Sequence, residues 1–258
     1  MMAPIRVLLA GESWVANSTH HKGWDFFSST IYETGVLYLE AAVTAAGMAF
    51  THLPSHLAGV QFPNTEEGLA AYDVIILSDI GANTLLLHPD TWIHGRPTPN
   101  RLRLLRDWVT RGGGLIMCGG YYSFAGIYGA ARYHRTPIED VLPVDISPYD
   151  DRVEVPEGVV PLLVNTEHPI LAGFRGPWPA LLGYNEVALK PDAQLLATAD
   201  EHPLLAVRHV DRGRTLAWMS DIGPHWCPEP FATWDGYARL WCQAIAWVAR
   251  DDGSQAAR

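Results

Sequence analysis

Three near-continuous apolar runs restrict the fold of this chain more than any other feature. They cover residues 5–11 (IRVLLAG), 72–81 (YDVIILSDIG) and 115–120 (LIMCGG), and each ends in glycine or polar residues. Such runs are typical of parallel strands that are buried on both faces of a sheet. Between them, residues 36–47 and 100–114 repeat apolar side chains at helical spacing and end in glycine. This alternation predicts βαβ units and an α/β fold built on a mainly parallel sheet.

Shorter patterns predict the remaining elements. We expect one further strand in the first half, a short helix and a polar excursion in the middle, and extra strands followed by a helix at the C-terminal end. These lie at 48–54, 136–144, 145–158, then 159–164, 194–199, 203–210 and 213–221, and finally about 232–250. No linker, low-complexity tract or long repeat interrupts the 258 residues, so we expect a single domain over 1–258.

Charge and cysteine content exclude several classes of protein. The formal net charge is -10, and no basic stripe is present that could displace counterions from nucleic-acid phosphates. No run of 18 apolar residues occurs and the N-terminus lacks a signal-type segment, so we expect a cytoplasmic protein without membrane contact. The three cysteines form no CxxC pair, which favours reduced thiols over disulfides or a structural zinc site.

Polar and aromatic residues gather where the predicted strands end. In an open α/β sheet, ligands bind beyond the carboxyl ends of the strands, so these residues are the candidate site. The short sequence SDIG occurs at 78–81 and again at 220–223, which suggests that two strands each place an aspartate in one cleft. The alternative is that each aspartate caps its own turn. The candidate ligand-binding residues are Glu12, Ser13, Trp14, Asp79, Asn83, Gly119, Gly120, Tyr121, Asn185, Asp221 and Trp226.

Residues 12–33 read as a long polar loop that contains adjacent histidines, His20 and His21. Long loops in compact domains are often functional. A metal could in principle be bound by one of these histidines with Asp79 and His225, but no HxH or HExxH spacing supports such a site. We therefore predict neither a metal nor a cofactor.

Cys118 ends the third apolar run and is a candidate nucleophile. A reactive thiol needs a base, because the thiolate is the attacking species. His225 could be that base, with Glu229 four residues later to orient it, which would form a Cys-His-Glu relay. The alternative is that Cys118 is a small apolar residue of the core and that His225 has a structural role among prolines and aromatic residues.

Several longer stretches carry a family pattern: GESW (11–14), YDVIILSDIGANT (72–84), the block from 100 to 144 with GGGLIMCGGYYSF and TPIEDVLPV, VVPLLVNTEHPIL (159–171), LLGYNEV (181–187) and GRTLAWMSDIGPHWCPEPFATWDGY (213–237). Together they resemble the putative glutamine amidotransferase family, class I glutamine amidotransferase-like proteins of bacteria, over nearly the whole chain. The resemblance implies a flavodoxin-like sheet with helices on both faces. In active members of that superfamily, a cysteine on a sharp strand-to-helix turn, the nucleophile elbow, attacks the amide of glutamine. A histidine and a glutamate in an H-P-E motif assist it, backbone amides form an oxyanion hole, and ammonia passes to a partner synthase.

The site residues correspond only in part to that pattern. Cys118 lies at or next to the elbow, and His225 and Glu229 match H-P-E with two extra residues before Pro-Glu. The elbow needs small residues two before and two after the nucleophile, where this chain has Ile116 and Gly120. When the chain is aligned with the family pattern, Gly119 could equally occupy the elbow. Relatives often carry an aliphatic residue at the position of Cys118. These departures favour a structural cysteine.

Three functions remain open from the sequence. The first is an amidotransferase-like protein with a degenerate nucleophile site, which binds or acts on a small polar, sugar-like metabolite. Trp14, Tyr121 and Trp226 would stack on it, Asn83, Asn185 and Asp221 would hydrogen-bond it, and Glu12, Asp79 or His225 would supply acid–base chemistry. The second is an active glutaminase or amide hydrolase that uses Cys118, His225 and Glu229. The third is a non-catalytic subunit that would form a homo-oligomer through Trp108, Trp241 and Trp247 on predicted helix faces.

Overall fold

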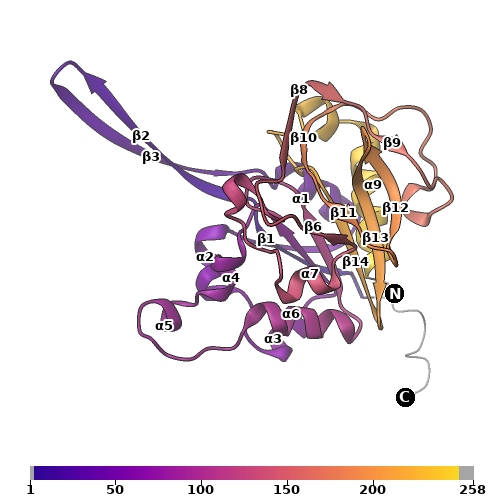
Figure 1. Ribbon diagram of the computed structural model, residues 1–258, viewed down its shortest axis with the longest axis horizontal. Coiled ribbons are helices and arrows are strands. Elements are labelled where there is room, and N and C mark those ends of the chain that lie inside the picture. The colour runs from indigo at the N-terminus through magenta and orange to yellow at the C-terminus, as the bar shows by residue number, and fades with distance from the viewer. Residues whose placement is uncertain (1–2, 250–258) are drawn as a thin grey trace.

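An eight-stranded sheet forms the centre of the computed structural model, which describes residues 3–249 (Figure 1). Its first five strands run parallel to one another, and each of the last three is antiparallel to the strand before it. The order is β4 (Ala49–Leu53), β1 (Arg6–Gly11), β5 (Val74–Ser78), β6 (Gly114–Cys118), β14 (Gly213–Trp218), β13 (His202–Val210), β12 (Gln194–Ala199) and β9 (Leu162–Leu163). The three apolar runs are thus three adjacent central strands, and the predicted mainly parallel sheet with extra C-terminal strands is confirmed.

Burial explains the composition of these strands. Every residue of β5, β6 and β14 is buried, as is every residue of β1 after its first. Strands that are covered on both faces need apolar side chains at consecutive positions, because no side faces water. The polar residues of these strands therefore collect at their ends, where the sheet meets solvent.

Helices cover both faces of the sheet (Figure 1). The first and the last long helices, α1 and α9, contact one another on one face, and the group around α6 covers the other. None of the helices within residues 3–249 has the length and apolarity needed to cross a bilayer. The helices are α1 (Leu37–Ala45), α2 (Ser55–Gln61), α3 (Glu66–Ala70), α4 (Ala82–Leu86), α5 (Pro89–Trp92), α6 (Arg101–Thr110), α7 (Pro137–Val141), α8 (Glu229–Ala232) and α9 (Asp235–Val248), with 3-10 turns at Ile127–Gly129 and Pro169–Leu171.

The polar excursion predicted at 145–158 is wrong in part, because it contains most of a strand. β8 (Arg152–Val159) pairs with β10 (Leu181–Asn185), and β7 (Val144–Asp145) pairs with β11 (Ala188–Leu189). Both are two-stranded sheets outside the main one. β8 contains the charged residues Arg152, Glu154 and Glu157 and a proline, and only its last residue is buried, so its apolar signal is weak.

The long polar loop predicted at 12–33 is also wrong. β2 (Ser13–Lys22) and β3 (Asp25–Thr34) form a two-stranded antiparallel hairpin that projects from the body of the molecule (Figure 1). Its residues are mostly exposed and are rich in Ser, Thr and His, so neither face carries the apolar stripe that marks a half-buried strand. Pairing is unbroken from Ser13–Thr34 to Lys22–Asp25.

Trp108, Trp241 and Trp247 are not available as an interface. Their exposed fractions are only 7%, 2% and 6%, because all three pack into the core. Helical spacing places a tryptophan on the apolar face of a helix, but it does not tell whether that face meets the sheet or another chain. Here these faces meet the sheet and the neighbouring helices.

Candidate functional site

A cleft of about 420 Å³ lies at the carboxyl ends of the central strands. Residues that directly follow β1, β5, β6 and β14 line it, as the open-sheet rule predicts. The lining consists of Glu12, Trp14, Asp79, Tyr121, Tyr122, Asp221, Pro224 and His225. Six of these eight were candidates from the sequence.

The two acidic residues that follow β1 and β5 have unusual backbones. Glu12 has φ 49° and Asp79 has φ 44°, in the left-handed region that L-residues other than Gly, Asn and Asp rarely adopt. The Glu12 amide donates to the Ser78 carbonyl at 2.7 Å, and the Asp79 amide donates to the Ser123 hydroxyl at 3.1 Å. Such strain costs about 1–3 kcal/mol per residue and clusters at functional sites.

The two SDIG segments do bring their aspartates to one place. A side chain at Gly120 would lie 2.8 Å from Asp221 Oδ1 and 3.0 Å from Asp79 Oδ1, so both carboxyl groups flank this glycine. Asp79 accepts from the Tyr122 amide at 2.7 Å, far along the chain, and is therefore not a cap of its own turn. Asp221 accepts from the Trp226 amide at 3.0 Å and does cap its own turn.

The acidic residues of the cleft and His225 all have raised pKa values, which favours their protonated forms. Burial, and then the charges of Asp221 and Asp79, raise the pKa of Glu12 well above its usual range. Burial raises the pKa of Asp79 to about 6 and also raises the pKa of Asp221. The hydrogen bond from His225 Nδ1 to Asp221 Oδ2, 3.2 Å long, raises the pKa of His225. Several carboxyl groups that cannot all ionise together therefore share one cleft.

Cys118 does not reach this cleft. Its side chain is fully buried at the end of β6, and burial raises the pKa of its thiol well above the ordinary value. Nearby Glu12 and Asp221 disfavour the thiolate further. His225 is hydrogen-bonded to Asp221, and Glu229 is an exposed residue at the start of α8. In the structure the three side chains of the expected relay therefore form no chain of hydrogen bonds.

The backbone amides of the elbow turn already have acceptors. The Gly119 amide donates to the carbonyls of Trp218 at 2.7 Å and Ser220 at 2.9 Å. The Gly120 amide donates to Asn185 Oδ1 at 3.0 Å. A side chain at Gly119 would lie 2.4 Å from the Met219 carbonyl oxygen, so no nucleophile fits at that position either. These amides are not free to stabilise an oxyanion.

Four other residues that the sequence suggested as ligand contacts do not line the cleft. Asn185 is buried below the cleft, bonded to Gly120 and to Asp151. Trp226 is also buried, with its indole N–H donated to Glu154 at 2.9 Å, and so cannot stack on a ligand as predicted. Ser13 accepts the Ser55 amide, and Asn83 lines a separate hollow beside α2 and α4.

The histidines proposed as metal ligands lie on the hairpin. His20 stacks on Phe27 at a ring separation of 4.6 Å, and His21 contacts Phe26. Neither lines the cleft with Asp79 and His225. Among residues 3–249, no three His, Cys, Asp or Glu side chains are grouped so as to hold a metal ion.

Sequence reasoning missed four residues that shape the site. Ser78 donates its hydroxyl to Glu12 Oε2 at 2.6 Å, and Tyr122 lines the cleft. Glu154 receives both the Tyr121 hydroxyl and the Trp226 indole, and Asp151 receives the amides of the turn after Tyr121. The position of Ser78 in the first SDIG segment was a usable signal. Nothing local marks Glu154 or Asp151, because each acts across a long sequence separation.

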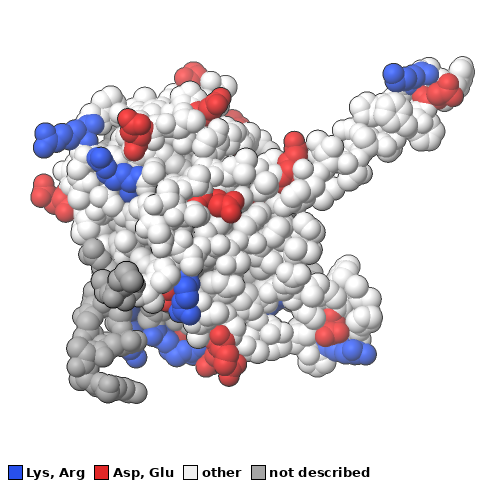
Figure 2. Space-filling model, turned by 180° about the vertical axis from the view of Figure 1, so that it is seen from behind, with Lys and Arg blue, Asp and Glu red and all other residues white. Residues whose placement is uncertain are grey.

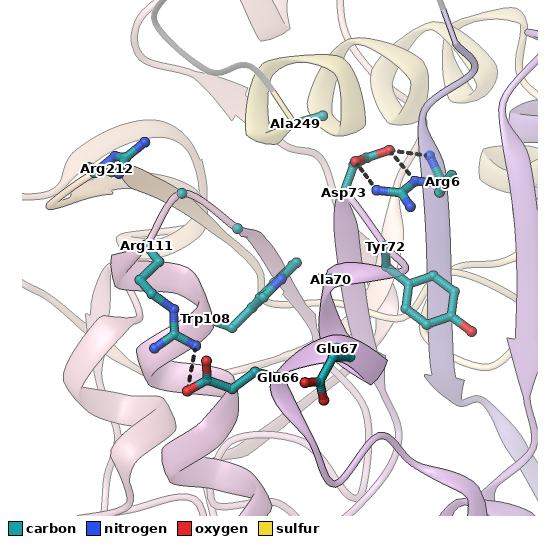
Figure 3. A pocket seen from close by; sticks show the side chains of 12 residues that line it. Arg6, Glu66, Glu67, Ala70, Tyr72, Asp73, Trp108, Arg111, Arg212 and Ala249 are labelled. Carbon is teal, nitrogen blue, oxygen red and sulfur yellow. Dashed lines mark hydrogen bonds and ion pairs between the residues drawn. The ribbon is translucent and has the colours of Figure 1, made fainter. Parts of the chain in front are cut away.

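A second hollow, of about 610 Å³, lies at the amino ends of the strands (Figure 3). Four of the six ionic side chains that line it form two ion pairs. Arg6 and Asp73 pair at 2.8 Å, and Arg111 pairs with Glu66 at 3.4 Å. This is the end of an α/β sheet that usually serves stability, and no strained acidic residue lines it. The cleft at the carboxyl ends is therefore the candidate functional site.

Comparison with known proteins gives a family and a fold. A model of the putative glutamine amidotransferase family matches residues 6–250. The chain belongs to this family. A cytoplasmic protein from Salmonella typhimurium, STM3548, is 40% identical with a TM-score of 0.92, and the match covers 95% of this chain and 99% of the other. A second, STM1381 from strain LT2, is 40% identical with a TM-score of 0.91, over 95% and 100% of the two chains.

More distant similarity is confined to the fold. A ThuA-like protein from Bacteroides uniformis is 17% identical with a TM-score of 0.58, and the match covers 98% of this chain and 95% of that one. A search of curated proteins found no significant match. The membership therefore confirms the amidotransferase-like sheet, while the chemistry of this family member has to be argued from its own cleft.

Proposed function

We propose that the cleft binds a small polar metabolite of the sugar-like class and acts on it by acid–base chemistry, with the nucleophile site of the fold lost. One observation carries the proposal: Glu12, Asp79, Asp221 and His225 converge on the cleft with raised pKa values, whereas the Cys118 thiol is buried behind it. Perturbed carboxyl groups in a cleft are typical of proton-transfer sites.

Each group has a role that fits its environment. Asp79, with a pKa of about 6, changes protonation near neutral pH and is suited to give or take a proton. Burial raises the pKa of Glu12 well above its usual range, which favours the protonated carboxyl that can donate a hydrogen bond to a hydroxyl or carbonyl oxygen. Asp221 bonds Nδ1 of His225 and leaves Nε2 as the second proton-transfer atom.

Aromatic side chains provide the walls of the cleft. Trp14 is fixed by donation of its indole N–H to Glu33 at 2.7 Å, and the Tyr121 hydroxyl donates to Glu154 at 3.0 Å. Flat aromatic surfaces beside carboxyl groups suit a ring that has apolar C–H faces and polar hydroxyl edges. This combination supports a sugar-like ligand over glutamine, which would need partners for a charged amine and a charged carboxylate.

Amide hydrolysis through a thiol has less support. It needs an accessible thiolate, a base in contact with it and free oxyanion donors. Here the thiol is buried, His225 is bonded to Asp221, and the amides of Gly119 and Gly120 are occupied. The two 40% identical relatives are described as cytoplasmic proteins, which supports a cytosolic setting for the reaction.

A ligand panel tests the proposal. Thermal shifts are measured with glucose, galactose, gluconate, sucrose, myo-inositol and glutamine, and any stabilising ligand is then incubated with the protein and analysed by mass spectrometry and NMR. We expect stabilisation by at least one polyhydroxylated compound. We expect Glu12→Gln and Asp79→Asn, which keep an acceptor oxygen, to weaken that binding at least about tenfold and to abolish turnover.

Matched variants separate the two chemistries. Asp200→Asn makes the same change at an exposed aspartate of similar backbone, φ 49°, and should behave as wild type. Cys118→Ala should keep both binding and turnover. Ammonia release from glutamine that disappears in Cys118→Ala would establish the amidase instead, and binding that survives in both acidic variants would refute the proposed site.

A further inference from the structure

The β2–β3 hairpin, residues 13–34, forms an arm whose base contacts α2 through Ser13 and Tyr32 and whose remaining residues are mostly exposed. Each strand is 10 residues long, so the arm reaches roughly 33 Å at about 3.3 Å per residue. Figures 1 and 2 show it extending away from the body into open space. An isolated two-stranded hairpin is marginally stable in water, so an arm of this length needs a partner.

The arm exposes large apolar side chains on both of its faces. Trp24 at the turn is fully exposed, and Phe26, Phe27, Ile31, Tyr32 and Val15 are each exposed by 48–69%. Cross-strand pairing puts Phe27 with His20 on one face and Phe26 with His21 on the other. From the 150–250 Å² that a large side chain can bury, these six offer roughly 700 Å². A standard protein interface buries about 800 Å² per partner.

The arm is also nearly free of charge. It carries Lys22 and Asp25 at its tip and Glu33 near its base, in a chain of net charge -10. Figure 2 shows its length as mostly uncharged surface, with charged side chains only toward the two ends. Two acidic bodies repel one another, and contact through nearly neutral arms keeps them apart. This distribution disfavours a basic partner, which the acidic body would attract instead, and a nucleic acid, which the acidic body would repel.

The edges of the arm are unprotected. β2 and β3 pair only with each other, so the outer edge of each strand has unpaired backbone amides and carbonyls. Proteins that keep such edges free use proline, bulges or several lysines to block them. Residues 13–34, all of which the structure describes, contain no proline, no register shift and one lysine. Such an edge is suited to pair with an identical edge across a two-fold axis, which closes at two copies.

We infer that the arm is the interface through which a second copy of this chain associates, by arm-to-arm contact of its aromatic tip and strand edges. The arm is distinct from the cleft, but its base lies next to the cleft. Thr34 donates its hydroxyl to the Glu12 carbonyl at 3.0 Å, and Trp14 of the cleft is the second residue of β2. The proposed interface is therefore continuous with the strand that forms one wall of the cleft.

Sedimentation and light scattering of the full chain, at concentrations from about 1 to 100 µM, test the inference. We expect wild type to have the mass of two chains or an even multiple. In a shortened-arm variant, residues 17–30 are replaced by Asn-Gly, so that Ala16 and Ile31, which already pair, flank a two-residue turn. This variant should be monomeric, with the circular dichroism of the body unchanged.

Point variants guard against misfolding of the shortened chain. Trp24→Ser with Phe26→Ser and Phe27→Ser should raise the dissociation constant at least about 30-fold, as loss of interface hot spots does. Trp92→Ser with Ile93→Ser, which removes exposed apolar residues of α5, should leave it unchanged. A monomeric wild type would overturn the inference, since the arm would then await another protein, and so would a shortened variant that is still dimeric.

Discussion

At the scale of single residues, the cleft shows how little the type of a residue says about its reactivity. Cys118 is the last residue of β6 and pairs with Ser78, the last residue of the neighbouring parallel strand β5. Asp79 directly follows Ser78. The Cys118 side chain is turned into the core and the Asp79 side chain lines the cleft. The sequence predicts correctly that polar and aromatic residues gather around a cleft at these strand ends. It does not predict which side chain faces the cleft, because that depends on the backbone turn of one residue.

Alkylation of the thiols follows from their burial. With iodoacetamide on the native protein, we expect Cys242, which is only partly buried, to react first, although burial raises its pKa too. Cys118 and Cys227 are buried and should react at least about 100-fold more slowly than a model thiol. Mass spectrometry of tryptic peptides gives the order. Rapid labelling of Cys118 in the folded protein would contradict its assignment to the core.

Asp79 should lower stability at neutral pH and above. Its folded pKa of about 6 exceeds the ordinary value of 3.8, so the folded protein binds the proton more tightly and loses stability as pH rises from about 4 to above 6. Asp79→Asn keeps an acceptor for the Tyr122 amide. We expect it to raise the free energy of unfolding by about 1–3 kcal/mol at pH 8 and to change little at pH 4. Urea unfolding of this variant and of Asp200→Asn at both pH values measures the difference.

At the scale of elements, sequence patterns predict best where one face is clearly buried. The runs at 5–11, 72–81 and 115–120 are strands because both of their faces need apolar side chains. The hairpin at 13–34 escaped prediction because no face of it is buried within the chain. β8 escaped for a related reason, since it is mostly not buried and its Glu154 accepts hydrogen bonds from Tyr121 and Trp226.

Arg101 joins three helices and should be sensitive to a conservative change. It is buried at the start of α6, and its guanidinium donates to carbonyls at the ends of α2 and α4, among them Leu85 and Gly59. A lysine ammonium has no planar fork and cannot reach both helices. We expect Arg101→Lys to cost about 2–4 kcal/mol in urea unfolding. Arg103→Lys, exposed on the same helix, should cost less than about 0.5 kcal/mol, and equal losses would show that this network is not responsible.

Asn185 connects β10 to the turn after β6. Its side chain is fully buried, accepts from the Gly120 amide at 3.0 Å and donates to Asp151 at 2.8 Å. Asn185→Ala leaves these partners unsatisfied and should cost about 2–4 kcal/mol. Because Gly120 separates Asp79 from Asp221, ligand affinity in the cleft should fall as well. Unfolding and calorimetry together check this; a loss of stability with unchanged affinity would limit Asn185 to a structural role.

At the scale of the whole molecule, stability should be greatest in mildly acidic solution. As the pH rises, the buried carboxyl groups of Glu12, Asp79 and Asp221, whose pKa values are raised, must ionise, Asp79 near pH 6, and His225 loses the proton that its bond to Asp221 favours. As the pH falls below about 4, the unfolded chain takes up protons at Asp73 and Asp150 before the folded protein does, because arginine partners lower the folded pKa values of both, and stability falls. Urea midpoints from pH 3 to 9 should therefore pass through a maximum between about 4 and 6. A maximum above pH 7 would contradict the burial of these acids.

We propose that the family fold persists here while a carboxyl cluster replaces its thiol chemistry. The most direct test is calorimetric titration, from pH 5 to 8, of the ligand that the panel selects. For wild type and Cys118→Ala we expect the same affinity, with the same change near pH 6, and for Asp79→Asn a weaker affinity without that change. Loss of binding in Cys118→Ala together with normal binding in Asp79→Asn would contradict the claim.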